Sequence, residues 1–242
     1  HELVHIVVND MAGSFESSSR SLFGKVNPDK NQPLSMLYSL LTNHNRYTPR
    51  WYQEAIAVFM ETWFSGGYGR ILGNFDEMYF RTLVNNKNNF PSTSELENYT
   101  SHKTIFLENI LYLYGARFVA HLSDKYGVKK LIEWFSLQPE EFYPGLESKF
   151  KDIYGVEFNS FWEEFVNNEI EFQRRNIETL KQYPLTDLNY LTNKSFGWVT
   201  KLTYDSKTNS ILFGYHRPGE LASIERLNLN KIESIKISTL PS

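Results

Sequence analysis

Residues 48–67 read TPRWYQEAIAVFMETWFSGG, a stretch that predicts a helix in the core of the protein. Thr48 offers an N-cap oxygen, Pro49 presets the backbone angle of a first helical turn, and the glycine pair at 66–67 ends the apolar run. Glu54 lies inside this run, where a lone carboxylate is costly to bury unless a cation or a metal accompanies it. The stretch therefore indicates a core element that also carries a chemical site.

Residues 1–5 read HELVH, which is the pattern H-E-x-x-H. On a helix, the spacing of four places the imidazoles of His1 and His5 on one face, where they suit a single zinc ion, and lets Glu2 aim at a water on that ion without ligating it. We expect this helix to run from His1 to Met11 and to be buried by its valines and isoleucine, which would make two unpartnered imidazoles costly. The alternative is a surface helix with two unrelated histidines.

A catalytic zinc site takes three protein ligands and keeps one position open for water. Glu54 is the best candidate for the third ligand; the alternative is a carboxylate that pairs with Arg50 or points to solvent. Glu61 falls on the same helical face and could support the ligands from behind, recognise a substrate amine, or be solvated near the helix end. Three nitrogen and oxygen ligands disfavour a purely structural metal site, because such sites normally close the fourth position.

Helical periodicity covers most of the chain up to about residue 180. Further helices are predicted over 34–41, 78–84, 129–135, 140–154 and 160–181. The helix over 78–84 is preceded by the spacing of a capping box, from Asn74 to Glu77. An apolar stripe between Ile105 and Leu122 predicts another helix, which ends at Gly127. Phe158, Phe161, Trp162 and Phe165 form an aromatic stripe that we assign to core packing.

After Pro184 the pattern alternates with the period of strands. Four short antiparallel strands are predicted over 198–204, 211–215, 222–227 and 232–237. Four antiparallel strands could make one blade of a propeller, but an isolated blade buries only part of its faces. We therefore expect that the blade packs on the helical part or that more blades follow beyond Ser242. The expected fold is mainly α, with a helical domain over 1–180 and a β segment over 181–242.

The composition of the chain limits the partners and the kinds of catalysis that it can support. The chain has 242 residues, a formal net charge of −3 and no cysteine. The net charge gives no basic surface to attract nucleic acid. No apolar stretch is long enough to span a membrane. The absence of cysteine excludes disulfides, thiolate metal sites and thiol nucleophiles. Any catalysis must use carboxylates, imidazoles, hydroxyls or a metal held by nitrogen and oxygen.

The segment WYQEAIAVF at 51–59 resembles the W-x-x-E-G-x-A-x-Y/F segment of the gluzincin metallopeptidases. Together with HELVH, it resembles the peptidase MA-like family that carries TolB-like propeller repeats downstream. Softer similarities are SLFG at 21–24, GRILGNFDEM at 69–78 with Arg81, and YLYGARF at 112–118. The resemblance covers most of residues 1–178.

The resemblance implies a zinc ion held by His1, His5 and Glu54, with Glu2 as general base. It also implies that the helical domain is the C-terminal part of a gluzincin domain and that the β segment is the first blade of a TolB-like propeller. Ala55 replaces the family's usual glycine, a change expected to narrow the cleft there.

Two further roles come from the same resemblance, each with two candidates. Tyr112 stands where zinc aminopeptidases keep a tyrosine that stabilises the tetrahedral intermediate, and Tyr114 is its competitor. Asn9 stands one turn after His5 and is expected to orient it, with Asp10 as the alternative.

The expected function is zinc-dependent hydrolysis of a peptide or protein substrate, in an extracytoplasmic location. The alternative is a catalytically inactive, peptidase-like protein that holds a peptide or polysaccharide at an outer surface. A zinc ligand at the first residue of a helix would be poorly held, so we expect His1 to belong to a longer native chain. The remaining histidines are expected to be packing or surface residues: His44, His102, His121 and His216.

Overall fold

The computed structural model describes residues 1–69, 73–98, 110–136, 145–184, 186–217 and 219–239, with the backbone alone at 44, 46, 97, 98 and 110. The chain divides into two compact units, one ending at Gln182 and one beginning at Tyr183. The first unit is helical and the second is a small antiparallel sheet. Among the described residues, no helix combines the length and the apolarity needed to cross a lipid bilayer.

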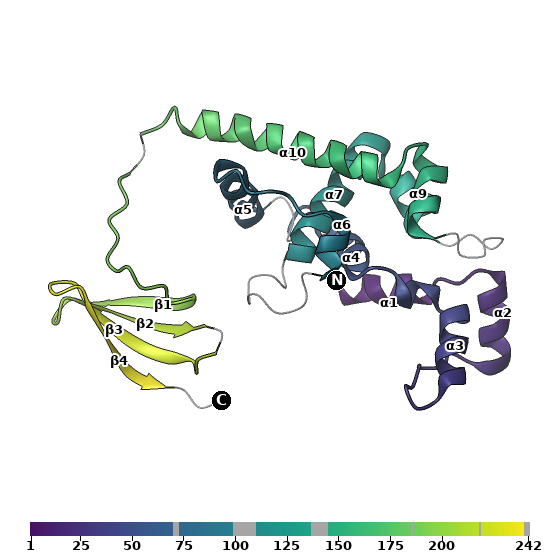
Figure 1. Cartoon of the computed structure of the whole chain (residues 1–242), viewed down its shortest axis with the longest axis horizontal. Helices are drawn as coiled ribbons and strands as arrows, with labels where there is room; N and C mark the ends of the chain where they lie inside the picture. The colour runs from purple at the N-terminus through teal and green to yellow at the C-terminus, as the bar shows by residue number, and fades with distance from the viewer. Residues whose placement is uncertain (70–72, 99–109, 137–144, 185, 218, 240–242) are drawn as a thin grey trace. The chain divides into compact units, whose positions relative to one another are not determined.

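The helical unit follows the predicted pattern along most of its length (Figure 1). Its elements are α1 (Glu2–Asp10), α2 (Ser14–Phe23), α3 (Pro33–Thr42), the 3₁₀ turn η1 (His44–Tyr47), α4 (Arg50–Phe64), α5 (Asn74–Asn85), α6 (Thr93–Asn98), α7 (Ile110–Tyr126), α8 (Val128–Phe135), α9 (Leu146–Tyr154) and α10 (Phe158–Leu180). The helices predicted at α3, α4, α5, α8 and α10 are confirmed, as are the described parts of those at α7 and α9; residues 105–109 and 140–144 lie outside the described ranges. α2 and α6 were not predicted, because polar residues make up most of their sequences.

The start of α4 differs from the prediction. Thr48 is not its N-cap: the cap is Pro49, and the helix begins at Arg50. The Thr48 hydroxyl instead donates to the carbonyl of Asn45 at 2.8 Å, and the Gln53 amide donates to the Thr48 carbonyl at 3.1 Å. The hydroxyl is therefore used to close the preceding 3₁₀ turn. The predicted end is confirmed, because α4 stops at Phe64 just before the glycine pair at 66–67, which has positive φ.

The capping box predicted before α5 is also wrong. Asn74 is the first helical residue and Gly73 is the N-cap. The carboxylate of Glu77 does not reach back to the helix start but pairs with Arg117 of α7 at 2.7 Å. A distant cation outcompetes the local backbone for this side chain.

The centre of the helical unit is the packing of α4 against α7. A Cβ at Gly115 of α7 would lie 2.8 Å from the Trp51 carbonyl oxygen and 2.9 Å from the Ala55 Cβ, so only glycine allows this approach. Ala55 is fully buried at this contact. Ala55 therefore faces α7, and the expectation that it narrows a cleft is wrong.

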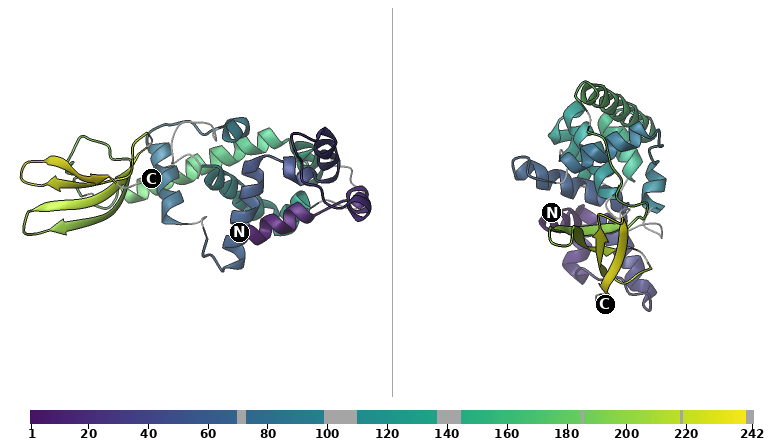
Figure 2. Two further views of the ribbon diagram at one scale, coloured as in Figure 1. Left: turned by 90° about the horizontal axis from the view of Figure 1, so that it is seen from below. Right: turned by 90° about the vertical axis from the view of Figure 1, so that its left-hand side faces the viewer.

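The aromatic stripe of α10 is core, as predicted. Phe158, Phe161, Trp162 and Phe165 are each at most 6% exposed. Their rings lie 4.9–5.7 Å from the ring of Phe118 on α7, mostly in tilted or edge-to-face arrangements. In Figures 1 and 2, α4 and α7 lie between α10 on one side and α1 on the other.

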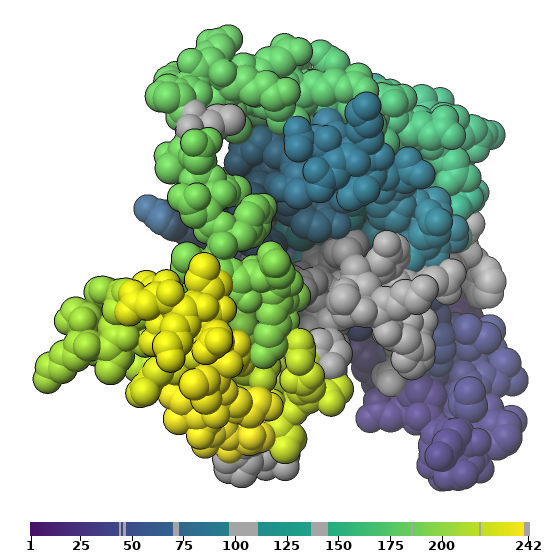
Figure 3. Space-filling model, turned by 60° about the vertical axis from the view of Figure 1, so that its left-hand side comes forward, coloured from purple at the N-terminus to yellow at the C-terminus, as the bar shows by residue number. Residues whose placement is uncertain are grey.

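α1 is less buried than its sequence predicts. Val8 is 7% exposed, whereas Leu3, Ile6 and Val7 are 75%, 63% and 57% exposed. The helix also ends at Asp10 rather than at Met11, and Gly13 is the N-cap residue of α2. Only one side of α1 packs on α4, while α2 and α3 pack on each other as a lobe at one end of the unit (Figure 3, purple and blue).

The second unit is a four-stranded antiparallel meander, as predicted. Its strands are β1 (Trp198–Asp205), β2 (Ser210–His216), β3 (Ser223–Asn228) and β4 (Glu233–Thr239), in the order β1-β2-β3-β4. One face carries a small cluster of Phe196, Phe213, Tyr215 and Leu227. Glu225 is 1% exposed at its side chain and pairs with Lys194 at 3.1 Å, while the Lys194 ammonium lies 4.8 Å from the Phe196 ring centroid. An ion pair between a buried carboxylate and a partly exposed lysine thus closes this cluster.

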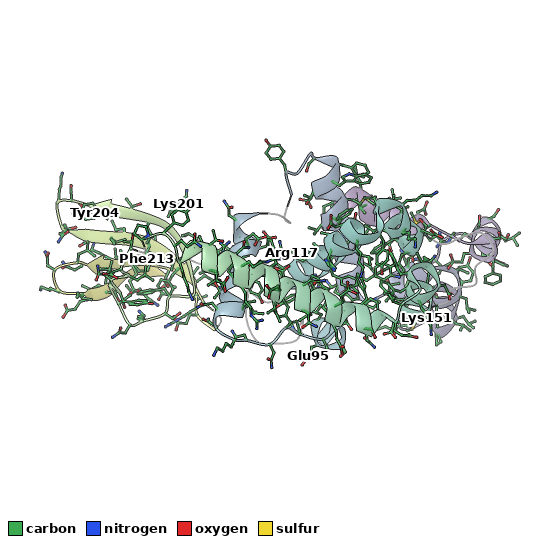
Figure 4. All side chains as sticks on the ribbon, turned by 90° about the horizontal axis from the view of Figure 1, so that it is seen from above. Glu95, Arg117, Lys151, Lys201, Tyr204 and Phe213 are labelled. Carbon is green, nitrogen blue, oxygen red and sulfur yellow. The ribbon has the colours of Figure 1, made fainter. Side chains whose placement is uncertain are left out.

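Arg117 joins three helices of the first unit. It is 7% exposed, and its guanidinium lies 2.7 Å from Glu77 and 3.5 Å from Asp76 of α5 and 2.6 Å from Glu169 of α10 (Figure 4). Gln173, which is fully buried, donates to both Glu77 and Glu169 at 2.8 Å. The network is the polar part of an otherwise aromatic core, and the sequence pattern gave no sign of it.

Replacing Arg117 tests this network. Arg117→Met should lower the free energy of unfolding of the helical unit by about 3–5 kcal/mol, because it leaves three carboxylates without their common cation. The matched control is Arg174→Met on the exposed side of α10, which should change stability by less than about 0.5 kcal/mol. Urea unfolding followed by far-ultraviolet circular dichroism measures both, and equal losses in the two variants would contradict the assignment.

Candidate metal centre

Three helices bring the candidate residues together. His1 caps the start of α1 and His5 follows one turn later, while Glu54 and Glu61 lie two turns apart on α4 and Tyr112 lies in the first turn of α7. The start of the chain lies next to α4 (Figure 1). The juxtaposition therefore depends on how α1 packs against α4.

Three atoms form a nearly equilateral triangle. Nε2 of His1, Nε2 of His5 and Oε2 of Glu54 are separated by 3.2 Å along each edge. Ligands bound to zinc at about 2.0–2.2 Å with tetrahedral angles would be about 3.3 Å apart, so the triangle fits one face of a tetrahedral site. Among the described residues, this is the one group of three histidine, aspartate or glutamate side chains gathered closely enough to hold a metal ion.

The three candidate ligand atoms also have the chemistry that a metal ion requires. All three atoms carry lone pairs, and two imidazole nitrogens 3.2 Å apart require a shared proton or a cation between them. The side chains of His1, His5 and Glu54 are 12%, 20% and 12% exposed. The arrangement is therefore shielded from bulk solvent but reachable by a small ligand.

Glu61 supports His1 from the other side of its ring. Oε2 of Glu61 lies 3.1 Å from Nδ1 of His1, a distance at which Nδ1–H donates to the carboxylate. A proton on Nδ1 leaves the Nε2 lone pair facing the triangle, which is the tautomer a metal needs. Of the three roles open to Glu61 from the sequence, this contact fits support of a ligand.

Glu54 has partners on both of its oxygens. Oε1 lies 3.8 Å from Nε of Arg50, one helical turn earlier, while Oε2 faces the imidazoles. The pairing with Arg50 that the sequence offered as an alternative therefore coexists with the approach to His1 and His5. The contact of Arg50 with Oε1 leaves Oε2 directed at the triangle.

Tyr112 belongs to the site and Tyr114 to the core. The Tyr112 ring lies 6.0 Å from that of His1, and its hydroxyl hydrogen-bonds with Glu54 and Arg50. Tyr114 is 1% exposed, and its ring packs against Phe80 and neighbouring aromatic side chains. A substrate at the triangle can reach Tyr112, whereas Tyr114 is enclosed.

The protonation of Tyr112 follows from its surroundings. Partial burial and the negative charge of Glu54 raise the pKa of the phenol above its ordinary value, although Arg50 acts in the opposite direction. The hydroxyl therefore keeps its proton at neutral pH. It remains available as a hydrogen-bond donor at that pH.

The remaining predicted residues lie at the edge of the site. Glu2 is exposed in the first turn of α1, next to His1 in the chain. Among the described residues, no hydrogen bond joins His5 to Asn9 or Asp10: the Asp10 carboxylate is 74% exposed and faces Lys25 at 3.4 Å, and the Asn9 carbonyl accepts from the same lysine. The proposed orientation of His5 by Asn9 or Asp10 thus gains no support from the geometry.

The other histidines are separate from the triangle where they are described. His121 lies near Glu164 of α10 and His216 ends β2 as an exposed residue. The side chain of His44 and the whole of His102 lie outside the described residues.

No protein-family model, curated protein or solved structure matches this chain. The resemblance to gluzincin peptidases therefore rests on the two motifs themselves. What the geometry adds is that these motifs, separated by nearly fifty positions, meet at one point.

Removing the carboxylate behind His1 tests the tautomer argument. Glu61→Ala should weaken zinc binding by about tenfold, because the support of a histidine ligand by a carboxylate contributes on that order. Competition with a chromophoric chelator measures the affinity. Glu163→Ala, an exposed glutamate on α10, is the control, and equal affinities for the two variants would show that Glu61 does not support a ligand.

Proposed function

We propose that this protein is a zinc-dependent peptidase that hydrolyses peptide bonds at the triangle of His1, His5 and Glu54. The observation that carries the proposal is the 3.2 Å separation of all three donor atoms. Two imidazoles and one carboxylate form the ligand set of a class of zinc hydrolases, and three ligands keep a position open for water.

The metal has one task in this proposal. A bound zinc ion would act as a Lewis acid toward a water molecule and toward the scissile carbonyl. His1, His5 and Glu54 would hold it, with Glu61 fixing the tautomer of His1 and Arg50 fixing the orientation of Glu54. These two supporting contacts would give His1 and Glu54 a fixed direction before any metal arrives.

Glu2 would move the proton. Its carboxylate follows His1 directly, is exposed, and lies outside the triangle, so it can approach a water there without competing as a ligand. In the proposed reaction Glu2 accepts a proton from the attacking water and delivers it to the amine nitrogen as the peptide bond breaks. The same carboxylate thus acts first as base and then as acid.

Tyr112 would stabilise the charge that develops on the substrate carbonyl. Its hydroxyl now bonds to Glu54 and Arg50, and it retains its proton at neutral pH. Turning the phenol from Glu54 toward the substrate would supply one hydrogen bond to the oxyanion. Arg50 would then keep Glu54 in place alone.

Loss of the third ligand should abolish metal binding. Glu54→Ala removes the carboxylate oxygen of the triangle and should reduce the bound zinc to well below one ion per chain. Elemental analysis after dialysis measures the stoichiometry, with Glu163→Ala as the control. Full zinc content in Glu54→Ala would refute its role as a ligand.

Loss of the general base, Glu2, should reduce peptide cleavage without reducing zinc binding. Glu2→Gln keeps the size of the side chain but cannot accept a proton, so kcat for peptide cleavage should fall by about 10²–10⁴ while zinc stays bound. A fluorogenic peptide library with and without chelator provides the assay. If the unaltered protein binds zinc and peptide but cleaves nothing, the inactive binding protein is the better description.

A further inference from the structure

A concave surface lies on the helical unit, between α4, α7 and α10. Its volume is about 850 Å³, within the range of sites that bind small organic ligands. Aromatic side chains form much of its wall, among them Phe59, Trp63, Phe165 and Phe172. Trp63 is 48% exposed and Phe172 is 40% exposed, so a ligand can reach their rings. We call this surface the α10 groove.

The α10 groove is separate from the candidate metal centre. Phe59 and Trp63 are one turn apart on α4 and share a face, whereas Glu54 and Glu61 lie on a different face of the same helix. α4 and α7 lie between α1, which carries the histidines, and α10 (Figures 1 and 2). A ligand in the groove would therefore not touch the triangle.

The lining of the α10 groove has more negative than positive side chains. Its lining has two guanidinium groups, Arg117 and Arg175, and more carboxylates: Glu77, Asp124, Glu169 and Glu171. Burial lowers the pKa of His121, which also lines the groove, so this imidazole is neutral at pH 7. The lining therefore has an excess of negative charge.

Arg117 does not offer its charge to a ligand. It is 7% exposed, one terminal nitrogen bonds to Glu77, and the other bonds to Glu169. Burial alone would raise the pKa of Glu77, but hydrogen bonds from Gln173 and Arg117 outweigh it and hold that pKa below its ordinary value. The carboxylate is thus ionised at neutral pH, and an anionic ligand would be repelled.

We propose that the α10 groove binds an organic cation, an ammonium or guanidinium group carried on an apolar body. The excess carboxylates attract the positive group, and a partly desolvated site strengthens this attraction. Trp63 stacks on Phe64 and the Phe172 ring has the Arg117 guanidinium 5.9 Å from its centroid, but the exposed parts of both rings suit a cation and the apolar body beside it. Such a ligand is either a free amine or the basic side chain of a peptide.

The first experiment compares probes that differ in charge alone. Phenethylammonium should bind the full chain saturably at millimolar concentrations, and at least about tenfold more tightly than the neutral 2-phenylethanol or the anionic 3-phenylpropionate. Isothermal titration calorimetry measures the affinities, with chelator present. Equal affinity for charged and neutral probes, or no saturable binding, would overturn the proposal.

The second experiment removes charge from the groove without touching the Arg117 network. Asp124 and Glu171 are exposed, so the double variant D124N/E171Q should fold normally and bind phenethylammonium about three- to tenfold more weakly. The matched control E147Q/E178Q removes the same charge at exposed positions outside the groove. Unchanged affinity in D124N/E171Q, or the same loss in the control, would show that groove charge does not select the ligand. Trp63→Ala should weaken binding through the lost ring.

A third comparison distinguishes the two sources of the cation. The peptide acetyl-Leu-Arg-Leu-amide should bind more tightly than phenethylammonium if the groove takes a basic side chain, and more weakly if it takes a free amine. Replacing arginine by citrulline in the peptide keeps its shape and removes its charge. Tighter binding of the citrulline peptide would contradict recognition of a cation. Because chelator is present throughout, a negative result here leaves the proposed peptidase activity to its own tests.

Discussion

The close approach of α4 and α7 at Gly115 fixes how the backbone of α4 lies against α7. The Trp51 carbonyl and the Ala55 methyl group occupy the space where any larger residue at Gly115 would place its Cβ. Glu54 precedes Ala55 by one residue, about 100° around the helix, and this direction brings its carboxylate beside His1 and His5 of α1. Tyr112, one turn before Gly115, is brought beside Glu54 by the same packing.

The candidate centre is consequently held from several directions. Arg50 and Tyr112 contact Glu54, and Glu61 contacts His1, so two of the three candidate ligands are each oriented by a neighbour. Gathering three lone-pair donors at 3.2 Å has an electrostatic cost without a proton or a cation among them. The zinc ion that we propose would remove this cost, and the orienting partners would hold its ligands in place.

α4 separates two chemically different regions. On the side of α1, imidazoles and carboxylates converge at one point; on the side of α10, aromatic rings surround the network of Arg117. The network has more carboxylates than cations, and Gln173 satisfies part of the excess with neutral hydrogen bonds. Joining α5, α7 and α10 through one guanidinium ties the helical unit together and leaves negative charge at the groove.

The sequence by itself determined the features that depend on neighbours along the chain. The periodicity of residues 51–64 and 160–181 gave helices, the alternation after Pro184 gave strands, and the spacing of four in HELVH put two imidazoles on one face. It also singled out Glu54, because a carboxylate inside an apolar run needs a partner. The tertiary structure alone decided which partner each side chain has: Glu77 goes to Arg117 rather than to its own helix start, Thr48 closes a turn instead of capping, and α1 leaves its apolar side exposed. Local patterns follow from repeating backbone geometry, whereas these choices depend on segments that are distant in the chain and meet only when the helices pack.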